Sequence, residues 1–146
     1  MIIKVLSQIG KCGVEFYSIQ EVYQETVVKG MERGASDIQD IFDVFKHERI
    51  QIVPTVAHPP KGGISATDSR VINTAKHIGA TIVSNDLKLG KKANNDAGVF
   101  VIGSPDILCL LYNNKAYSLN EYHFTIKELV RFNRISSILA ETYLKE

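Results

Sequence analysis

The sequence predicts an α/β protein with three layers (α/β/α), a parallel sheet of about four strands and a C-terminal helical extension. Two observations lead to this fold class. Short β-branched runs alternate with segments of helical periodicity, which is the order of βαβ units. After residue 102 only helical segments remain. We therefore expect an α/β domain over residues 1–112 and, over residues 113–146, a two-helix extension packed on the same domain.

The composition is that of a globular protein and argues against several other classes. The chain has 146 residues, 45% of them hydrophobic and 23% charged, which is enough for one domain with a real core. Lysine and arginine number 17 against 16 acidic residues, so any basic surface for nucleic acid must be local. No apolar run approaches the roughly 20 residues of a membrane span. Cys12 and Cys109 have no metal-ligand spacing, which favours a reduced, cytoplasmic protein.

The first half of the chain carries two strand patterns among helical ones. Residues 2–9 have apolar side chains at i, i+3, i+4 and i+7 and favour an amphipathic helix, with a strand over residues 2–6 as the alternative. The expected strands of this half are Val14–Tyr17 and Ile50–Val53. Ser18 followed by Glu21 predicts a capping box at the start of a helix. A further helix is expected after Ser36.

A helix followed by a buried strand, between residues 64 and 86, organises the fold. Ser65 or Thr67 can cap this helix, and Gly79 ends it. The run Ala80–Val83 has no polar alternation, as in a parallel strand that is buried on both faces.

Two carboxylates of this stretch are expected to meet at one edge of the sheet. Asp86 follows the strand directly, at the position where open α/β sheets hold their ligands. Asp68 lies in the first turn of the helix, on the same face as Ile72 and Ala75, and should point toward the sheet edge. Acidic side chains directed at one place are a first indication of a metal site.

The second half of the chain completes the α/β pattern and then becomes helical. Pro105 stands at a favourable first helical position, and Ser118 with Glu121 predicts a second capping box. The expected elements are a short helix over Leu87–Asn94, a turn over Asn95–Gly98, a last strand over Val99–Ile102, and helices to Tyr112, from Ser118 to about Phe132, and over Ile135–Leu144.

Several segments resemble PIN-domain proteins. They are YSIQEVYQE (17–25), ISATDSRVINTA (64–75), TIVSNDLKLGKKA (81–93) and GVFVIG (98–103), in that order. The tail resembles the two-helix extension of a PIN subgroup found in toxin–antitoxin pairs. The resemblance covers nearly the whole chain and implies a metal-dependent nuclease, most often a ribonuclease. It also implies RNA as substrate, an antitoxin protein as partner and a homodimer.

The resemblance assigns the site residues by position. Glu25, Asp68 and Asp86 match the family's catalytic, metal-binding acids, and Ser84 and Asn85 occupy the supporting positions before the last acid. Carboxylates are suitable ligands for the implied Mg²⁺ or Mn²⁺, because these hard ions prefer oxygen. The lysine cluster beside Asp86 is available to contact the RNA backbone. It consists of Lys88, Lys91 and Lys92.

One departure from the family leaves an alternative function open. The family begins with a strand that ends in an aspartate, whereas this chain has no acidic residue before Glu15. The acidic site is therefore incomplete, and a catalytically inactive PIN-like binding or scaffold protein is the competing hypothesis. A third hypothesis, an unrelated α/β protein that binds a phosphorylated ligand, is disfavoured because no glycine-rich phosphate loop follows a strand.

Each candidate residue also has a purely structural interpretation. Asp68 stands three residues after Ser65 and can complete a capping box, and Asp86 can cap the next helix. Glu25 and the lysines can belong to solvated helix faces. The four histidines have no ligand spacing.

Overall fold

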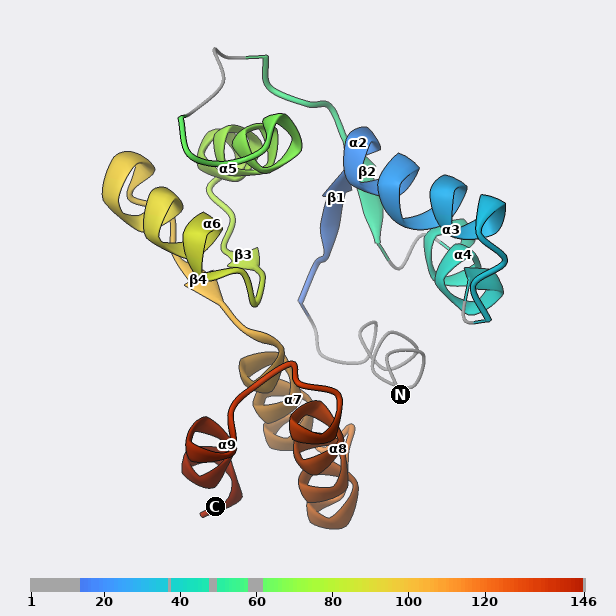
Figure 1. Cartoon of the computed structure of the whole chain (residues 1–146), viewed down its shortest axis with the longest axis vertical. Coiled ribbons are helices and arrows are strands. Elements are labelled where there is room, and N and C mark those ends of the chain that lie inside the picture. The colour runs from blue at the N-terminus through green and yellow to red at the C-terminus, as the bar shows by residue number, and fades with distance from the viewer. Residues whose placement is uncertain (1–13, 37, 48–49, 58–61, 146) are drawn as a thin grey trace. The chain divides into compact units, whose positions relative to one another are not determined.

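The computed structural model describes residues 14–36, 38–47, 50–57 and 62–145 (Figure 1). They divide into two compact units, which we call the α/β unit (residues 15–101) and the helical unit (residues 102–145, together with residue 14). The boundary lies before helix α7 (Ser104–Asn113), so this helix belongs to the helical unit. The packing of a two-helix extension on the α/β domain stays a prediction. No described helix is both long and apolar enough to cross a membrane.

The first strand pair of the α/β unit is parallel, as the sequence predicts. β1 (Tyr17–Ile19) pairs with β2 (Gln51–Val53), with Tyr17 opposite Gln51 and Ile19 opposite Val53. The helices that connect them are α2 (Gln20–Tyr23), the π-helix η2 (Gln24–Val28), α3 (Lys29–Glu32) and α4 (Ile38–Lys46). Such a helical crossover is the normal connection between parallel strands. The segment over residues 2–9 lies outside the described residues.

The predicted capping box of Ser18 and Glu21 is wrong. Ser18 lies within β1 opposite Ile52, and the helix begins at Gln20 without a side-chain cap. Strand pairing therefore extends further along the chain than the sequence predicts, because β2 supplies backbone partners up to Ile19. The Glu21 carboxylate is left for a contact elsewhere, and it accepts a hydrogen bond from the Thr55 hydroxyl at 2.7 Å.

The organising helix and strand form close to their predicted positions. Helix α5 (Ala66–Ile78) has Ser65 as its N-cap, and the Ser65 hydroxyl accepts a hydrogen bond from the Asp68 amide at 3.0 Å. Gly79 ends the helix with φ +68°, a left-handed conformation that glycine adopts without a Cβ penalty. The elements that follow are β3 (Ile82–Val83), α6 (Leu87–Lys92), the π-helix η3 (Ala93–Ala97) and β4 (Val101–Ile102).

These elements enclose a small apolar core. Its buried members are Ile72, Ala75, Ile82, Leu89, Ala93 and Val99. The expectation that the strand is buried on both faces is wrong in part, because Ile82 is 6% exposed but the next residue, Val83, is 46% exposed. Only one face of this strand packs on the core, and alternate side chains of a strand point to opposite faces.

The α/β class is confirmed, although the strands are short. β3 pairs with β4, and the Ile82 amide donates to the Phe100 carbonyl at 2.9 Å. The four described strands therefore form two sheets of two strands each, rather than one continuous ladder. The predicted turn after α6 is instead the π-helix η3, which ends at Gly98 with φ +63°.

The helical unit consists, in its described part, of α7, α8 (Leu119–Arg131) and α9 (Ser137–Leu144), which pack on one another (Figure 1). The predicted capping box at Ser118 and Glu121 is confirmed. The Tyr143 hydroxyl on α9 donates to Asp106 on α7 at 2.7 Å. Burial, together with this hydrogen bond, raises the pKa of Tyr143 to about 12.

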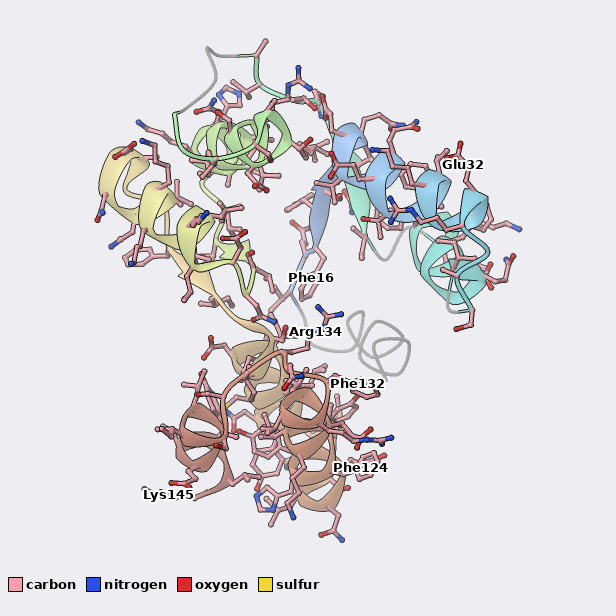
Figure 2. All side chains as sticks on the ribbon, viewed as in Figure 1. Phe16, Glu32, Phe124, Phe132, Arg134 and Lys145 are labelled. Atoms are coloured by element: carbon pink, nitrogen blue, oxygen red, sulfur yellow. The ribbon has the colours of Figure 1, made fainter. Side chains whose placement is uncertain are left out.

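Exposed aromatic side chains remain on α8 and directly after it. Phe124 is 64% exposed and Phe132 is 53% exposed, and both are labelled in Figure 2. Leu129, by contrast, is buried within the helical unit and is not available to a partner. Self-association through this apolar surface stays a prediction.

Candidate metal and RNA site

Asp68 and Asp86 line the same pocket of the α/β unit. The pocket has a volume of about 420 Å³, and its other lining residues are Gly63, Ile64, Ser65 and Lys88. Since a water molecule occupies roughly 30 Å³ of liquid, this space can accommodate a hydrated cation together with a phosphate group. The pocket thus combines two carboxylates and one ammonium group at the starts of two helices.

The Asp68 carboxylate is available to a ligand. The Asp68 amide donates to the Ser65 hydroxyl, which is one half of a capping box. The other half would be a bond from the Ser65 amide to the Asp68 carboxylate, and the described residues do not form it. Nor does this carboxylate make a hydrogen bond or ion pair with any other described side chain. The structure therefore caps α5 without using the Asp68 side chain.

Asp86 combines a structural role with a free oxygen atom. Its Oδ1 atom caps α6 by accepting hydrogen bonds from the amides of Lys88 at 2.8 Å and Leu89 at 3.1 Å. The Asp86 amide in turn donates to the Ser84 hydroxyl at 3.1 Å, which orients the turn between β3 and α6. Both capping bonds use Oδ1, so Oδ2 remains for a ligand in the described part of the chain.

Glu25 does not line this pocket but reaches the helix that carries Asp68. It lies in η2, where the Lys29 amide bonds to the Gln24 carbonyl five residues back. The Glu25 carboxylate accepts a hydrogen bond from the Thr67 hydroxyl at 2.7 Å, and Thr67 directly precedes Asp68. The structure therefore brings Asp68 and Asp86 to one pocket, whereas Glu25 meets Thr67 in the first turn of α5, outside the pocket lining.

The three predicted lysines differ in their surroundings. Lys88 lines the pocket with the two aspartates. Lys92 forms an ion pair with Asp96 at 2.6 Å, one turn further along, which offsets its charge. Lys91 is exposed. Of the three, Lys88 is therefore the residue best placed to meet a phosphate group in this pocket.

Glu21 is a residue that sequence reasoning assigned wrongly. Its carboxylate accepts a hydrogen bond from Thr55 at 2.7 Å and pairs with Arg70 of α5 at 3.4 Å. The hydrogen bond from Thr55, and more weakly the Arg70 charge, lower the pKa of the Glu21 carboxyl below its ordinary value. The sequence did contain one indication that Glu21 faces the same way as Glu25. The two residues are four positions apart, and this spacing places both acids on one side of a helix.

The donor chemistry of the pocket suits a hard divalent cation. Both carboxylates and the nearby Ser65 hydroxyl offer oxygen atoms, as Mg²⁺ and Mn²⁺ require. Over residues 14–36, 38–47, 50–57 and 62–145, however, no three acidic, histidine or cysteine side chains lie close enough together to hold a metal ion. Mg²⁺ is commonly held by one or two carboxylates, water and substrate phosphates, so Asp68 and Asp86 fit a cation that the substrate helps to bind.

The fold is similar to that of a solved structure, a PilT N-terminus domain protein from the hyperthermophilic archaeon Sulfolobus solfataricus P2. The TM-score is 0.54 and the identity 19%, over 79% of this chain and 87% of that chain. No protein-family model and no curated protein match the sequence. At this identity the likeness establishes a PIN-like fold, and the activity has to be argued from the pocket.

Proposed function

We propose that this protein is a metal-dependent endoribonuclease of the PIN type. One observation carries the proposal: two aspartates with unengaged oxygen atoms line one pocket together with a lysine, in a chain with a PIN-like fold. In this proposal Asp68 and Asp86 hold Mg²⁺ or Mn²⁺ and Lys88 binds a phosphate of the RNA. Glu25, which accepts a hydrogen bond from Thr67 outside the pocket lining, would assist from there.

The residues of the pocket have separate tasks in this reaction. A bound divalent cation would supply a hydroxide near neutral pH and neutralise charge on the phosphate oxygens. Asp68 and Asp86 would orient the cation, and the Ser84 hydroxyl would hold the turn that presents Asp86. The Lys88 ammonium would place the scissile phosphate by charge attraction, while Asn85 flanks it on the same turn.

The proposed cellular role rests on the resemblance of the tail to PIN proteins of toxin–antitoxin pairs. A cytoplasmic endoribonuclease with a helical extension fits the toxin of a toxin–antitoxin pair, which its antitoxin neutralises. The exposed Phe124 and Phe132 offer apolar surface for a homodimer or for the antitoxin.

A catalytically inactive PIN-like scaffold is the second candidate. It is favoured by the absence of a three-ligand metal group among the described residues. Such a protein would still offer Lys88 to a phosphate backbone but would not cleave it.

A cleavage assay on labelled single-stranded RNA, with and without Mn²⁺, tests the proposal. The wild-type chain should cleave RNA only with the metal, and Asp68→Asn should abolish cleavage. Glu32→Gln is the matched control, because Glu32 is an exposed carboxylate of the same unit (Figure 2). RNA binding without cleavage by the wild-type chain would favour the scaffold instead.

A further inference from the structure

We infer that the outer face of helix α8 is a second surface for single-stranded RNA. The inference rests on the proposed function, because that function makes RNA the polyanion that this chain meets. Its basis is that α8 and the residues directly after it combine exposed aromatic rings with exposed cations. The members of this aromatic–basic face are Phe124, Lys127, Arg131, Phe132 and Arg134.

The spacing of these residues places three of them on one side of α8. The buried side of this helix consists of Tyr122, Thr125, Ile126 and Leu129. In a helix with 3.6 residues per turn, Phe124, Lys127 and Arg131 lie on the opposite side. All three are exposed, and Phe124 is labelled in Figure 2 together with Phe132. The helical unit therefore packs one side of α8 and leaves the aromatic–basic face to solvent.

Arg131 and Phe132 join the cationic and the aromatic parts of this face. The guanidinium carbon of Arg131 lies 5.3 Å from the centre of the Phe132 ring. Arg131 also pairs with Glu128 at 3.2 Å, but its side chain remains 71% exposed. A cation beside an aromatic ring is a favourable arrangement, and the two groups together suit a nucleotide, because the ring stacks on the base and the cation attracts the phosphate.

The charge of the aromatic–basic face favours a negatively charged partner. Three of its members are cations, whereas Glu128 is the one acidic residue between Phe124 and Arg134. Lys127 and Arg134 are exposed and form no ion pair with the residues that the structure describes. Because the whole chain has a net charge of only +1, this face is a local concentration of positive charge.

These cations distinguish RNA from a second copy of the chain. In a symmetric dimer the same face of both copies meets, so Lys127 and Arg131 would approach like charges. An RNA strand instead brings phosphates to the cations, and its unpaired bases stack on exposed rings such as that of Phe124. The exposed rings and the charge together therefore favour single-stranded RNA.

Fluorescence anisotropy of a labelled single-stranded RNA of mixed sequence, measured on the full chain in EDTA to prevent metal-dependent cleavage, tests this face. Phe124→Ala should weaken binding about tenfold, within the range for the loss of one stacked base. Phe124→Tyr keeps an aromatic ring and should bind like the wild type. Ile138→Ala is the matched control and should leave the affinity unchanged, because Ile138 is an apolar residue of α9 that is 79% exposed.

The salt dependence of binding gives a second measurement. Lys127→Gln should reduce the slope of log affinity against log salt concentration by about 0.7, the value for one phosphate contact on a single strand. Lys145→Gln is the control for charge, because Lys145 is an exposed lysine at the end of α9 (Figure 2). It should leave that slope unchanged.

Three results would overturn the inference. They are the absence of RNA binding by the wild-type chain, wild-type affinity in Phe124→Ala, and an equal loss of affinity in Ile138→Ala. If Phe124→Ala lowers the molar mass in light scattering but keeps its RNA affinity, the face belongs to a dimer and the inference is wrong.

Failure of the proposed function gives a different pattern. A wild-type chain that binds RNA through Phe124 but does not cleave it with Mn²⁺ would refute the nuclease and support this surface. Cleavage that depends on Asp68, together with RNA binding that does not depend on Phe124, would support the nuclease and refute this surface.

Discussion

Substitution of Asp86 should separate its structural role from its proposed metal-binding role. Asp86 Oδ1 accepts two amide hydrogen bonds at the start of α6, at 2.8 and 3.1 Å. Alanine removes both bonds, and loss of such a cap costs about 1 kcal/mol, with a range of roughly 0.5–2 kcal/mol. Asparagine keeps a capping oxygen in the same place and caps helices about as well as aspartate.

The two variants should therefore differ in stability but not in metal binding. We expect urea denaturation to show Asp86→Ala destabilised by about 1 kcal/mol and Asp86→Asn within a few tenths of a kcal/mol of wild type. Calorimetry should show Mn²⁺ binding lost in both, because neither retains a charged oxygen. Full Mn²⁺ affinity in the asparagine variant would refute the assignment of Asp86 as a ligand, and equal stability of the two variants would refute the capping geometry.

Three further predictions follow from burial and charge. Ile72→Ala should lower the free energy of unfolding by about 2–5 kcal/mol in denaturant titrations, because Ile72 is 0% exposed. The control Ile52→Ala should lower it clearly less, because Ile52 is 43% exposed, and equal losses would contradict the core described above. The pKa of Glu21 is lower in the folded chain than in the unfolded chain, so its ionised form stabilises the fold above the ordinary carboxyl pKa, and this stability is lost as pH falls through the folded pKa. Glu21→Gln should therefore reduce the loss of stability on acidification in a curve of unfolding free energy against pH, and an unchanged curve at acid pH would refute the Thr55 contact. Lys88→Gln should weaken RNA binding in fluorescence anisotropy more than Lys92→Gln, because Asp96 already pairs with Lys92, and the reverse order would contradict the pocket as the RNA contact.

Local rules were sufficient wherever the determinants lie within one turn of the chain. The Ser65 cap and the left-handed Gly79 at the two ends of α5 follow from neighbouring residues alone. The same holds for the capping box at Ser118, whose partner Glu121 is three residues away.

The features that could not be predicted from the sequence depend mainly on contacts between distant segments of the chain. Ser18 has the residue type and the spacing of a helix cap, but pairing with β2 keeps it in a strand. The bond between Glu25 and Thr67 joins segments 42 residues apart, and no local pattern encodes it. The π-helical turn around Glu25 also has no pattern in the sequence that separates it from an α-helix.

In the candidate site, too, some features follow from local motifs and others do not. The positions of Asp68 and Asp86 at the starts of two helices were predictable, because each follows from a short motif. Which of their oxygen atoms are engaged was not predictable, since Ser65 caps α5 alone and Asp86 caps α6 with one oxygen. This detail leaves both carboxylates able to bind a cation.

The most direct test of the central proposal is calorimetric titration of Mn²⁺ into the wild-type chain and into Asp68→Asn. Asp68 is the better probe of the two aspartates, because the described structure gives its carboxylate no helix-capping bond. We expect saturable binding in the wild-type chain that is lost in the variant. Equal binding by both chains, or no binding by the wild-type chain, would contradict the proposal that this pocket holds the metal of a nuclease.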